Sequence, residues 1–239
     1  MLAFFERLDS HIVVILFALF FGIAHSGMAA LRPALERYLP PRVYRWIFVL
    51  VSFGIAIPWL IYLVNHRYDG IVFFDWHESD FAHLIVFVLS TLAFFFLYPG
   101  TFHFLEILTI KKPKQRFHTT GIIRITRHPQ LTGMSLWCLA HFLWIGTSFM
   151  LATAFGLIGY HLFAAWHGDR RRLKLFGKDY QEQVLNCTSI LPFEAILAGK
   201  QKIYWREFRD WAYFWIIIFV VTVYALHPLI YENFPNWYF

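Results

Sequence analysis

The sequence predicts an all-α polytopic membrane protein, with six transmembrane helices in one bundle and short interfacial helices on the cytoplasmic side. Two observations predict this class. Of the 239 residues, 59% are hydrophobic, 21% are aromatic and only 15% are charged. A water-soluble domain carries about a quarter charged residues and has no interior large enough for so many aromatic side chains. The apolar residues also form long continuous runs, whereas strands of a membrane barrel alternate with a period of two.

Six apolar runs are each close to the 20 residues that cross the hydrocarbon core. The first follows a segment that is not basic, and its length favours a retained helix over a signal peptide. The fourth and fifth are separated by little more than Gly146, Thr147 and Ser148, which predicts a tight helical hairpin. The predicted spans are residues 11–31, 44–64, 81–99, 129–147, 148–166 and 211–230.

The basic residues orient these spans. The connections after the first, third and fifth runs hold 4, 6 and 9 Lys and Arg residues, and only Arg7 and Arg67 lie on the other side. By the positive-inside rule, the basic side is cytoplasmic and both termini are non-cytoplasmic. Topology alone accounts for this positive charge, so we expect no nucleic-acid partner. Two short apolar pieces flanked by basic residues, Phe102–Ile110 and Ile190–Leu197, are predicted to lie along the membrane surface.

No internal repeat or long flexible linker interrupts the chain, so we expect one domain over residues 1–239. Ionisable side chains at membrane depth are costly and therefore mark candidate sites. Two of them, His83 and His161, fall toward span ends, where an ordinary hydrogen bond satisfies an imidazole.

His25, Cys138 and His141 are stronger candidates. Small residues surround His25, in the run Gly22-Ile-Ala-His-Ser-Gly, and let a bulky flat group approach the helix closely. Cys138 and His141 are three residues apart and share one helix face. Imidazole and thiolate are haem ligands, and two helices that each supply one donor can hold a haem. Interhelical hydrogen bonding is the alternative interpretation, and zinc lacks a third and a fourth ligand at this depth.

A second candidate site precedes the fourth span. Arg127 and His128 stand directly before Pro129, which suits the first turn of a helix. Two basic side chains beside a positive helix end favour an anionic group. We therefore expect Arg127 and His128 to contact a cofactor, the alternative being an interfacial anchor that sets the depth of the helix.

Two motifs resemble the isoprenylcysteine carboxyl methyltransferase-like membrane families. The first is Arg127-His-Pro-x-x-x-Gly, and the second is Phe176-Gly-x-x-Tyr with an acidic residue upstream, Asp169. In those families such residues help to hold S-adenosylmethionine. The glutamate pair of those families is replaced here by Gly168 and Asp169, which weakens the methyltransferase interpretation.

The chain is more similar to the NnrU-like family, in its 15-cis-ζ-carotene isomerase branch. The similarity runs from about residue 20 to 230 and includes Gly22-Ile-Ala-His-Ser-Gly, Leu136-Trp-Cys-Leu-Ala-His and His161-Leu-Phe-Ala-Ala-Trp-His-Gly-Asp-Arg-Arg. The resemblance implies a haem b enzyme that isomerises the central 15-cis double bond of tri-cis-ζ-carotene. It implies that His25 and His141 are the axial iron ligands, with Cys138 as an alternative ligand, and that these three residues are catalytic.

The resemblance also implies partners and a location. The substrate is a hydrocarbon dissolved in the lipid bilayer, and an electron donor of unknown identity sets the redox state of the haem. The transit peptide of the plant members is not evident, so we expect a bacterial cytoplasmic or thylakoid membrane. Two alternatives remain, an S-adenosylmethionine-dependent membrane methyltransferase and a non-enzymatic haem-binding protein of the NnrU-like family.

Overall fold

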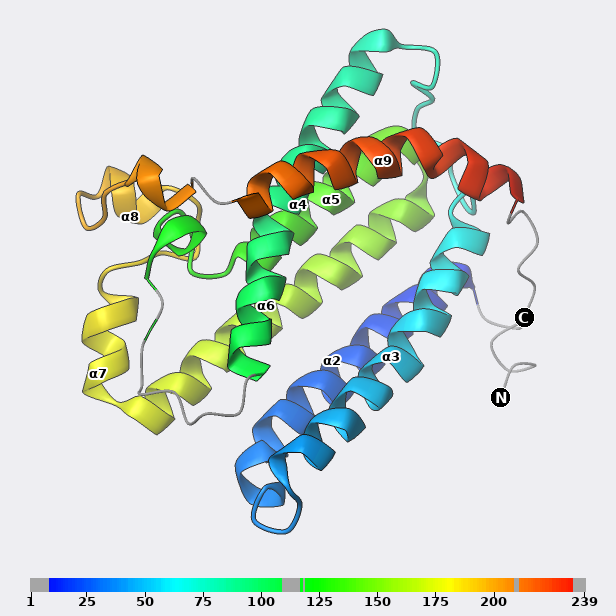
Figure 1. Cartoon of the computed structure of the whole chain (residues 1–239). Coiled ribbons are helices and arrows are strands. Elements are labelled where there is room, and N and C mark those ends of the chain that lie inside the picture. The colour runs from blue at the N-terminus through cyan, green and yellow to red at the C-terminus, as the bar shows by residue number, and fades with distance from the viewer. Residues whose placement is uncertain (1–8, 109–116, 118, 209–210, 234–239) are drawn as a thin grey trace.

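The computed structural model describes residues 9–108, 117, 119–208 and 211–233, and the regular elements in these ranges are helices (Figure 1). Six of them are long: α2 (Ser10–Leu35), α3 (Pro41–His66), α4 (Asp80–Leu108), α5 (Pro129–Ile145), α6 (Ser148–Phe176) and α9 (Trp211–Asn233). Five shorter elements follow the chain between them: η1 (Gly121–Arg124), α7 (Lys178–Tyr180), η2 (Gln181–Leu185), α8 (Glu194–Leu197) and η3 (Trp205–Phe208). The predicted all-helical class is confirmed for this part of the chain.

Within the described residues, four helices are long and apolar enough to cross a membrane: Ser10–Leu35, Pro41–His66, Asp80–Tyr98 and Ser148–Phe176. Helix α5 has 17 residues and the apolar part of α9 is Tyr213–Leu229, so both are short for a span. All six predicted runs form helices at the expected places. The number of membrane crossings is confirmed only as far as four candidates.

Local signals explain where the long helices begin. The Asp9 side chain accepts a hydrogen bond from the backbone N–H of His11 at the start of α2, and Thr147 caps α6 in the same way. Helix α3 opens on Pro41 and α5 on Pro129, a position where the missing N–H costs nothing.

The predicted hairpin between the fourth and fifth spans is present. Gly146 ends α5 with a left-handed φ of 71°, and its Cα faces the carbonyl oxygen of Phe74 so closely that a Cβ would lie 2.0 Å from that atom. The backbone N–H of Phe73 also donates to the carbonyl oxygen of Gly146, and that of Ser148 donates to the carbonyl oxygen of Ile71. The α3–α4 connection therefore packs directly on the hairpin and leaves room only for glycine.

Two expectations need correction. Helix α6 runs ten residues past the predicted end at 166, so Asp169 and the arginines that follow lie on a helix rather than in a loop. The surface piece predicted at Phe102–Ile110 is not separate, because α4 continues through residue 108, and residues 109 and 110 lie outside the described ranges. Both corrections have the same cause, since Leu, Lys, Arg and Phe sustain a helix beyond the hydrocarbon when nothing breaks it.

Helix α6 organises the bundle. Helices α2 and α6 run parallel, because His11 meets Ser148, Gly22 meets Tyr160 and Arg171 reaches Ala29. Helix α3 lies beside α2 in the opposite direction, α5 packs between α4 and α6, and α9 crosses α4 at a steep angle (Figure 1). The core lies between α2, α3 and the α5–α6 hairpin, around the residues Val14, Ala18, Trp59, Leu63, Ile145, Phe149 and Met150.

Candidate functional site

A polar cluster with several hydrogen bonds joins the start of α5 to the end of α6. One carboxylate oxygen of Asp169 accepts hydrogen bonds from Arg127 Nε at 2.8 Å and from His128 Nε2 at 2.9 Å. The other oxygen accepts from the Tyr180 hydroxyl at 2.8 Å, and Arg172 Nη1 lies 3.7 Å away. The motif residues Arg127, His128, Asp169 and Tyr180 are therefore brought together, although 53 positions separate the first from the last.

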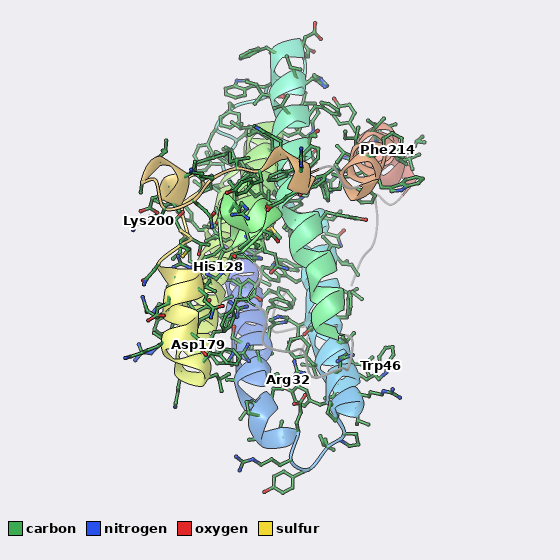
Figure 2. The ribbon with its side chains drawn as sticks, turned by 60° about the vertical axis from the view of Figure 1, so that its left-hand side comes forward. Arg32, Trp46, His128, Asp179, Lys200 and Phe214 are labelled. Atoms are coloured by element: carbon green, nitrogen blue, oxygen red, sulfur yellow. The ribbon has the colours of Figure 1, made fainter. Side chains whose placement is uncertain are left out.

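This Asp169 cluster is well shielded. The side chains of Arg127, His128 and Asp169 are 15, 12 and 12% exposed. Burial raises the pKa of Tyr180, so its hydroxyl keeps its proton and stays a donor to Asp169. Arg127 Nη1 also donates to the carbonyl oxygen of Thr188, which ties the cluster to the segment before α8. Figure 2 places His128 on the same side of the molecule as Asp179 and Lys200, with Phe214 on the opposite side.

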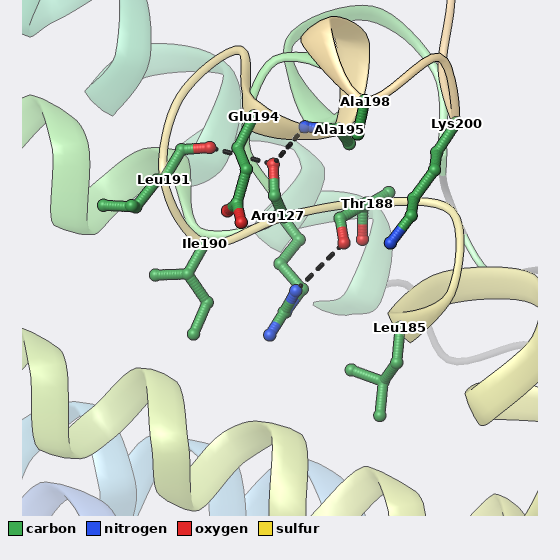
Figure 3. Close-up of a pocket in the computed structure, with 10 residues that line it drawn as sticks. Arg127, Leu185, Thr188, Ile190, Leu191, Glu194, Ala195, Ala198 and Lys200 are labelled. Carbon is green, nitrogen blue, oxygen red and sulfur yellow. Dashed lines mark hydrogen bonds between the residues drawn. The ribbon is translucent and has the colours of Figure 1, made fainter.

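A cavity of about 500 Å³ opens beside this cluster (Figure 3). Arg127 is part of its lining, and most of the other lining residues belong to the segment from the end of η2 through α8. The lining residues are Arg127, Leu185, Thr188, Ser189, Ile190, Leu191, Glu194, Ala195, Ala198 and Lys200. The sequence identified Arg127 as a contact for an anionic group, and the structure provides a cavity of ligand size next to it.

His25 belongs to α2 and contacts residues of α3 and α6. Its Nδ1 is 3.1 Å from Ser52 Oγ on α3, and its ring is stacked on Phe21 with centroids 5.1 Å apart. Phe48 and Tyr160 complete the surround, with centroids 4.6 and 6.3 Å from the imidazole. The small residues around His25 predict that a bulky flat group approaches this helix closely. In the structure Tyr160 occupies that place, because its side chain packs over Gly22.

Cys138 and His141 lie on α5, away from that aromatic group. Cys138 is 1% exposed. His141 Nδ1 donates to the carbonyl oxygen of Trp137 at 2.9 Å, and the ring of Trp137 lies against it, with centroids 3.8 Å apart. This bond fixes the ring orientation and leaves Nε2 as the side of the imidazole available to a ligand. The next ring is that of His227 on α9, with centroids 6.3 Å apart.

His25 and His141 lie at different levels of the bundle. Because α2 and α6 run parallel, His25 is level with residues 160–164 of α6. Because the chain reverses at Gly146 and Arg127 meets Asp169, His141 is level with residues 153–156. The backbone positions of the two histidines are thus offset by roughly 12 Å along the bundle.

The two histidines near span ends have ordinary hydrogen-bond partners, as the sequence suggests. His83 Nε2 donates to the carbonyl oxygen of His77 at 2.9 Å, and His161 Nδ1 donates to that of Leu157 at 2.8 Å. Each imidazole is satisfied by a nearby carbonyl, so neither needs a ligand to account for its place.

Comparison with known proteins identifies the family. The NnrU protein family matches residues 13–234. The chain belongs to the NnrU family. It is 44% identical over 225 residues to the chloroplastic 15-cis-ζ-carotene isomerase of Zea mays, and 41% identical over 221 residues to the enzyme of that name from Arabidopsis thaliana. These alignments cover 92 and 91% of this chain and 61 and 60% of the relatives, and no solved structure matches.

The names of these relatives bear on location. Both are described as chloroplastic, which does not fit the expectation of a bacterial enzyme. The membrane character of this NnrU protein rests on its apolar helices.

Sequence reasoning missed two residues around the candidate histidines of this NnrU protein. Tyr160 covers His25 from α6, and His227 faces His141 from α9. His227 is an ionisable residue in an apolar run, so the same argument that selected His141 applies to it. No sequence pattern pairs Tyr160 with His25, because their contact depends on the register between α2 and α6.

Proposed function

We propose that this chain is a 15-cis-ζ-carotene isomerase, which converts the central 15-cis bond of 9,15,9′-tri-cis-ζ-carotene to trans and gives 9,9′-di-cis-ζ-carotene. The observation that carries the proposal is 44% identity over 92% of the chain to a protein of that name. The reaction leaves the composition of the substrate unchanged. Its requirement is temporary loss of π overlap at one double bond, within a site that excludes water.

The helices suit a substrate of this kind. ζ-Carotene is a long hydrocarbon without polar groups, so it partitions into the bilayer and is recognised by shape and dispersion contacts. Aromatic side chains make good walls for a polyene. The His25 group, made of His25, Phe21, Phe48 and Tyr160, is a place in α2, α3 and α6 where a polar ring lies among aromatic ones. We propose that the polyene binds against this group from the lipid side.

The proposal extends to the membrane arrangement. Six apolar runs propose six crossings, and the charge distribution along the chain puts both termini on the non-cytoplasmic side. In this arrangement α5 and α9 complete the crossings as short helices, which a locally thin bilayer accommodates at modest cost.

Haem b remains a proposal that rests on the resemblance and on the donor chemistry of His25, His141 and Cys138. When bound, a ferrous haem with an open coordination position would supply a site that polarises the polyene. The test is the Soret absorbance of purified protein, with His25→Ala and His141→Ala beside the unmodified chain. Paired axial ligation requires both variants to lose the band, and retention by either one contradicts it.

Activity is tested in cells that supply tri-cis-ζ-carotene. Expression of this chain should convert the substrate to the di-cis isomer, separated by chromatography of the pigment extract. The methyltransferase alternative gives unchanged carotenoid and a methylated lipid product instead. A protein that carries haem but leaves the carotenoid unchanged would support the non-enzymatic alternative.

A further inference from the structure

We propose that the cavity beside Arg127 binds the zwitterionic headgroup of a membrane phospholipid, with its phosphate at Arg127 and Lys200 and its ammonium at Glu194. This site is separate from the proposed isomerase site, since it lies at the end of the bundle that carries Arg127 and Asp169, beyond the hydrophobic core. Its volume of about 500 Å³ falls within the range of small-molecule sites.

The cavity offers charged groups that the fold does not use. Within the described residues, no carboxylate lies within ion-pair distance of Lys200 and no cation within ion-pair distance of Glu194. Arg127 commits Nε to Asp169 and Nη1 to Thr188, which leaves Nη2 for a ligand. In Figure 3 the side chains of Arg127 and Lys200 both line the cavity, with Thr188 drawn between them. Two nitrogen donors of this kind match the oxygens of a phosphate.

The charge balance favours a zwitterion over a simple anion. Asp169, 2.8 Å from Arg127 Nε, already offsets the charge of that guanidinium. The two charges left over in the cavity lining are one cation, Lys200, and one anion, Glu194. A ligand with an oxyanion and an ammonium a few atoms apart satisfies both. An anionic headgroup would instead meet the Glu194 carboxylate unpaired.

Exposed apolar side chains in the segment that lines the cavity point to a lipid as the source of that zwitterion. Leu191 and Leu197, which flank the Glu194 side chain along the sequence, are 66 and 86% exposed, and Phe193 is 44% exposed. Apolar side chains next to charged ones are typical of segments that lie in the headgroup region of a bilayer. The wall itself is firmly held, because Ser189 Oγ accepts from the Ala195 N–H and donates to the Leu191 carbonyl.

The site is tested by calorimetric titration of the full chain in detergent with short-chain phosphatidylethanolamine and short-chain phosphatidylglycerol. We expect the ethanolamine lipid to bind about fivefold more tightly, the factor that corresponds to one exposed ion pair. Glu194→Gln should abolish this preference, and Lys200→Gln should weaken binding of both lipids. Lys202→Gln and Glu182→Gln are the matched controls, because both residues are exposed and lie outside the cavity lining, and they should leave both affinities unchanged.

Three results would overturn the proposal. Equal or tighter binding of phosphatidylglycerol by the unmodified chain would exclude the role given to Glu194. A preference that survives Glu194→Gln would place the ammonium elsewhere. Displacement of the lipid by S-adenosylmethionine would assign the cavity to a soluble amino acid zwitterion, and with it to the methyltransferase alternative.

Discussion

Asp169 links three separate segments of the chain through hydrogen bonds to its carboxylate. It belongs to α6, yet its carboxylate collects donors from the start of α5 and from α7. A carboxylate that is 12% exposed loses much of its hydration, and the loss is tolerated because charged and neutral donors surround it. The cluster therefore fixes how the end of the α5–α6 hairpin meets the segment that follows.

Replacing Asp169 by Asn should destabilise the protein strongly. The amide keeps the shape of the side chain but leaves the partly buried Arg127 without its counter-charge. Its NH₂ group would also face the groups that now donate hydrogen bonds to the carboxylate. We expect a loss of about 3 kcal/mol in the free energy of unfolding. Thermal or denaturant unfolding of the protein in detergent measures it.

The control for this substitution is Asp179→Asn. Asp179 is exposed and the structure gives its carboxylate no partner among the described residues, so the change should stay within about 0.5 kcal/mol. Tyr180→Phe removes a single neutral donor from the same cluster and should cost about 1 kcal/mol. Equal stability of the Asp169 and Asp179 variants would contradict the role given to the cluster.

Between elements, the close packing of α4 on α5 depends on Gly133. A Cβ at this position would lie 2.7 Å from the carbonyl oxygen of Ala93 and 2.7 Å from Leu97 Cγ. Gly133→Ala should therefore force the two helices apart and lower the free energy of unfolding by about 1–3 kcal/mol. Gly159→Ala is the matched control, because nothing lies within 4 Å of its Cβ, and alanine in that exposed helical position should be neutral or slightly stabilising.

A second link between elements has a defined pH dependence. Arg124 of η1 makes two hydrogen bonds to the Glu207 carboxylate of η3, at 2.7 and 2.8 Å, and the backbone N–H of Gly121 adds another. The hydrogen bond from Arg124 holds the pKa of Glu207 below its usual value of 4.5. A lowered carboxyl pKa stabilises the fold at pH values above 4.5, and the contribution is lost as the pH falls through the folded-state pKa.

The variant Glu207→Gln tests this link. At neutral pH it should be less stable than the unmodified chain by about 1 kcal/mol, since the pair is partly exposed. The difference should shrink as the pH falls below 4.5, because protonation of Glu207 in the unmodified chain removes the same charge. Unfolding curves of both proteins between pH 7 and pH 3.5 provide the comparison, and a difference that grows toward acid pH would contradict the assignment.

Elements could be predicted from this sequence better than the contacts between them. Apolar run length, Pro129 and Gly146 are local signals, and they place α5 and its hairpin correctly. Arg127, His128 and Asp169 also meet as their shared motif suggests. Counting residues from the cytoplasmic end already predicts that His25 and His141 differ in depth, but helix tilt and uncertain span boundaries leave the size of the offset open by a turn or two. Their relation depends on how α2 and α5 each pack along α6.

At the scale of the whole molecule, the two ends of the bundle differ in chemistry. One end carries arginines, including Arg171, whose Nη1 donates to the carbonyl oxygen of Ala29. That oxygen lacks its helical donor because Pro33, four residues on, has no N–H. The opposite end carries three histidine–aspartate pairs instead: His11–Asp9, His66–Asp69 and His77–Asp75. The parallel course of α2 and α6 puts both arginine-bearing helix ends on one side, as the charge distribution along the sequence requires.

This polarity predicts which thiols a membrane-impermeant reagent reaches. Cys187 lies at the arginine-bearing end and is partly exposed, whereas Cys138 is buried. In sealed cells, Cys187 should stay unlabelled until the membrane is permeabilised, and Cys138 should stay unlabelled in the folded protein throughout. A cysteine introduced by Glu78→Cys, at an exposed position in the connection before α4, should react without permeabilisation. Labelling of Cys187 in sealed cells, with protection of the introduced thiol, would show that the bundle is inserted the other way round and that the positive-inside argument fails for this chain.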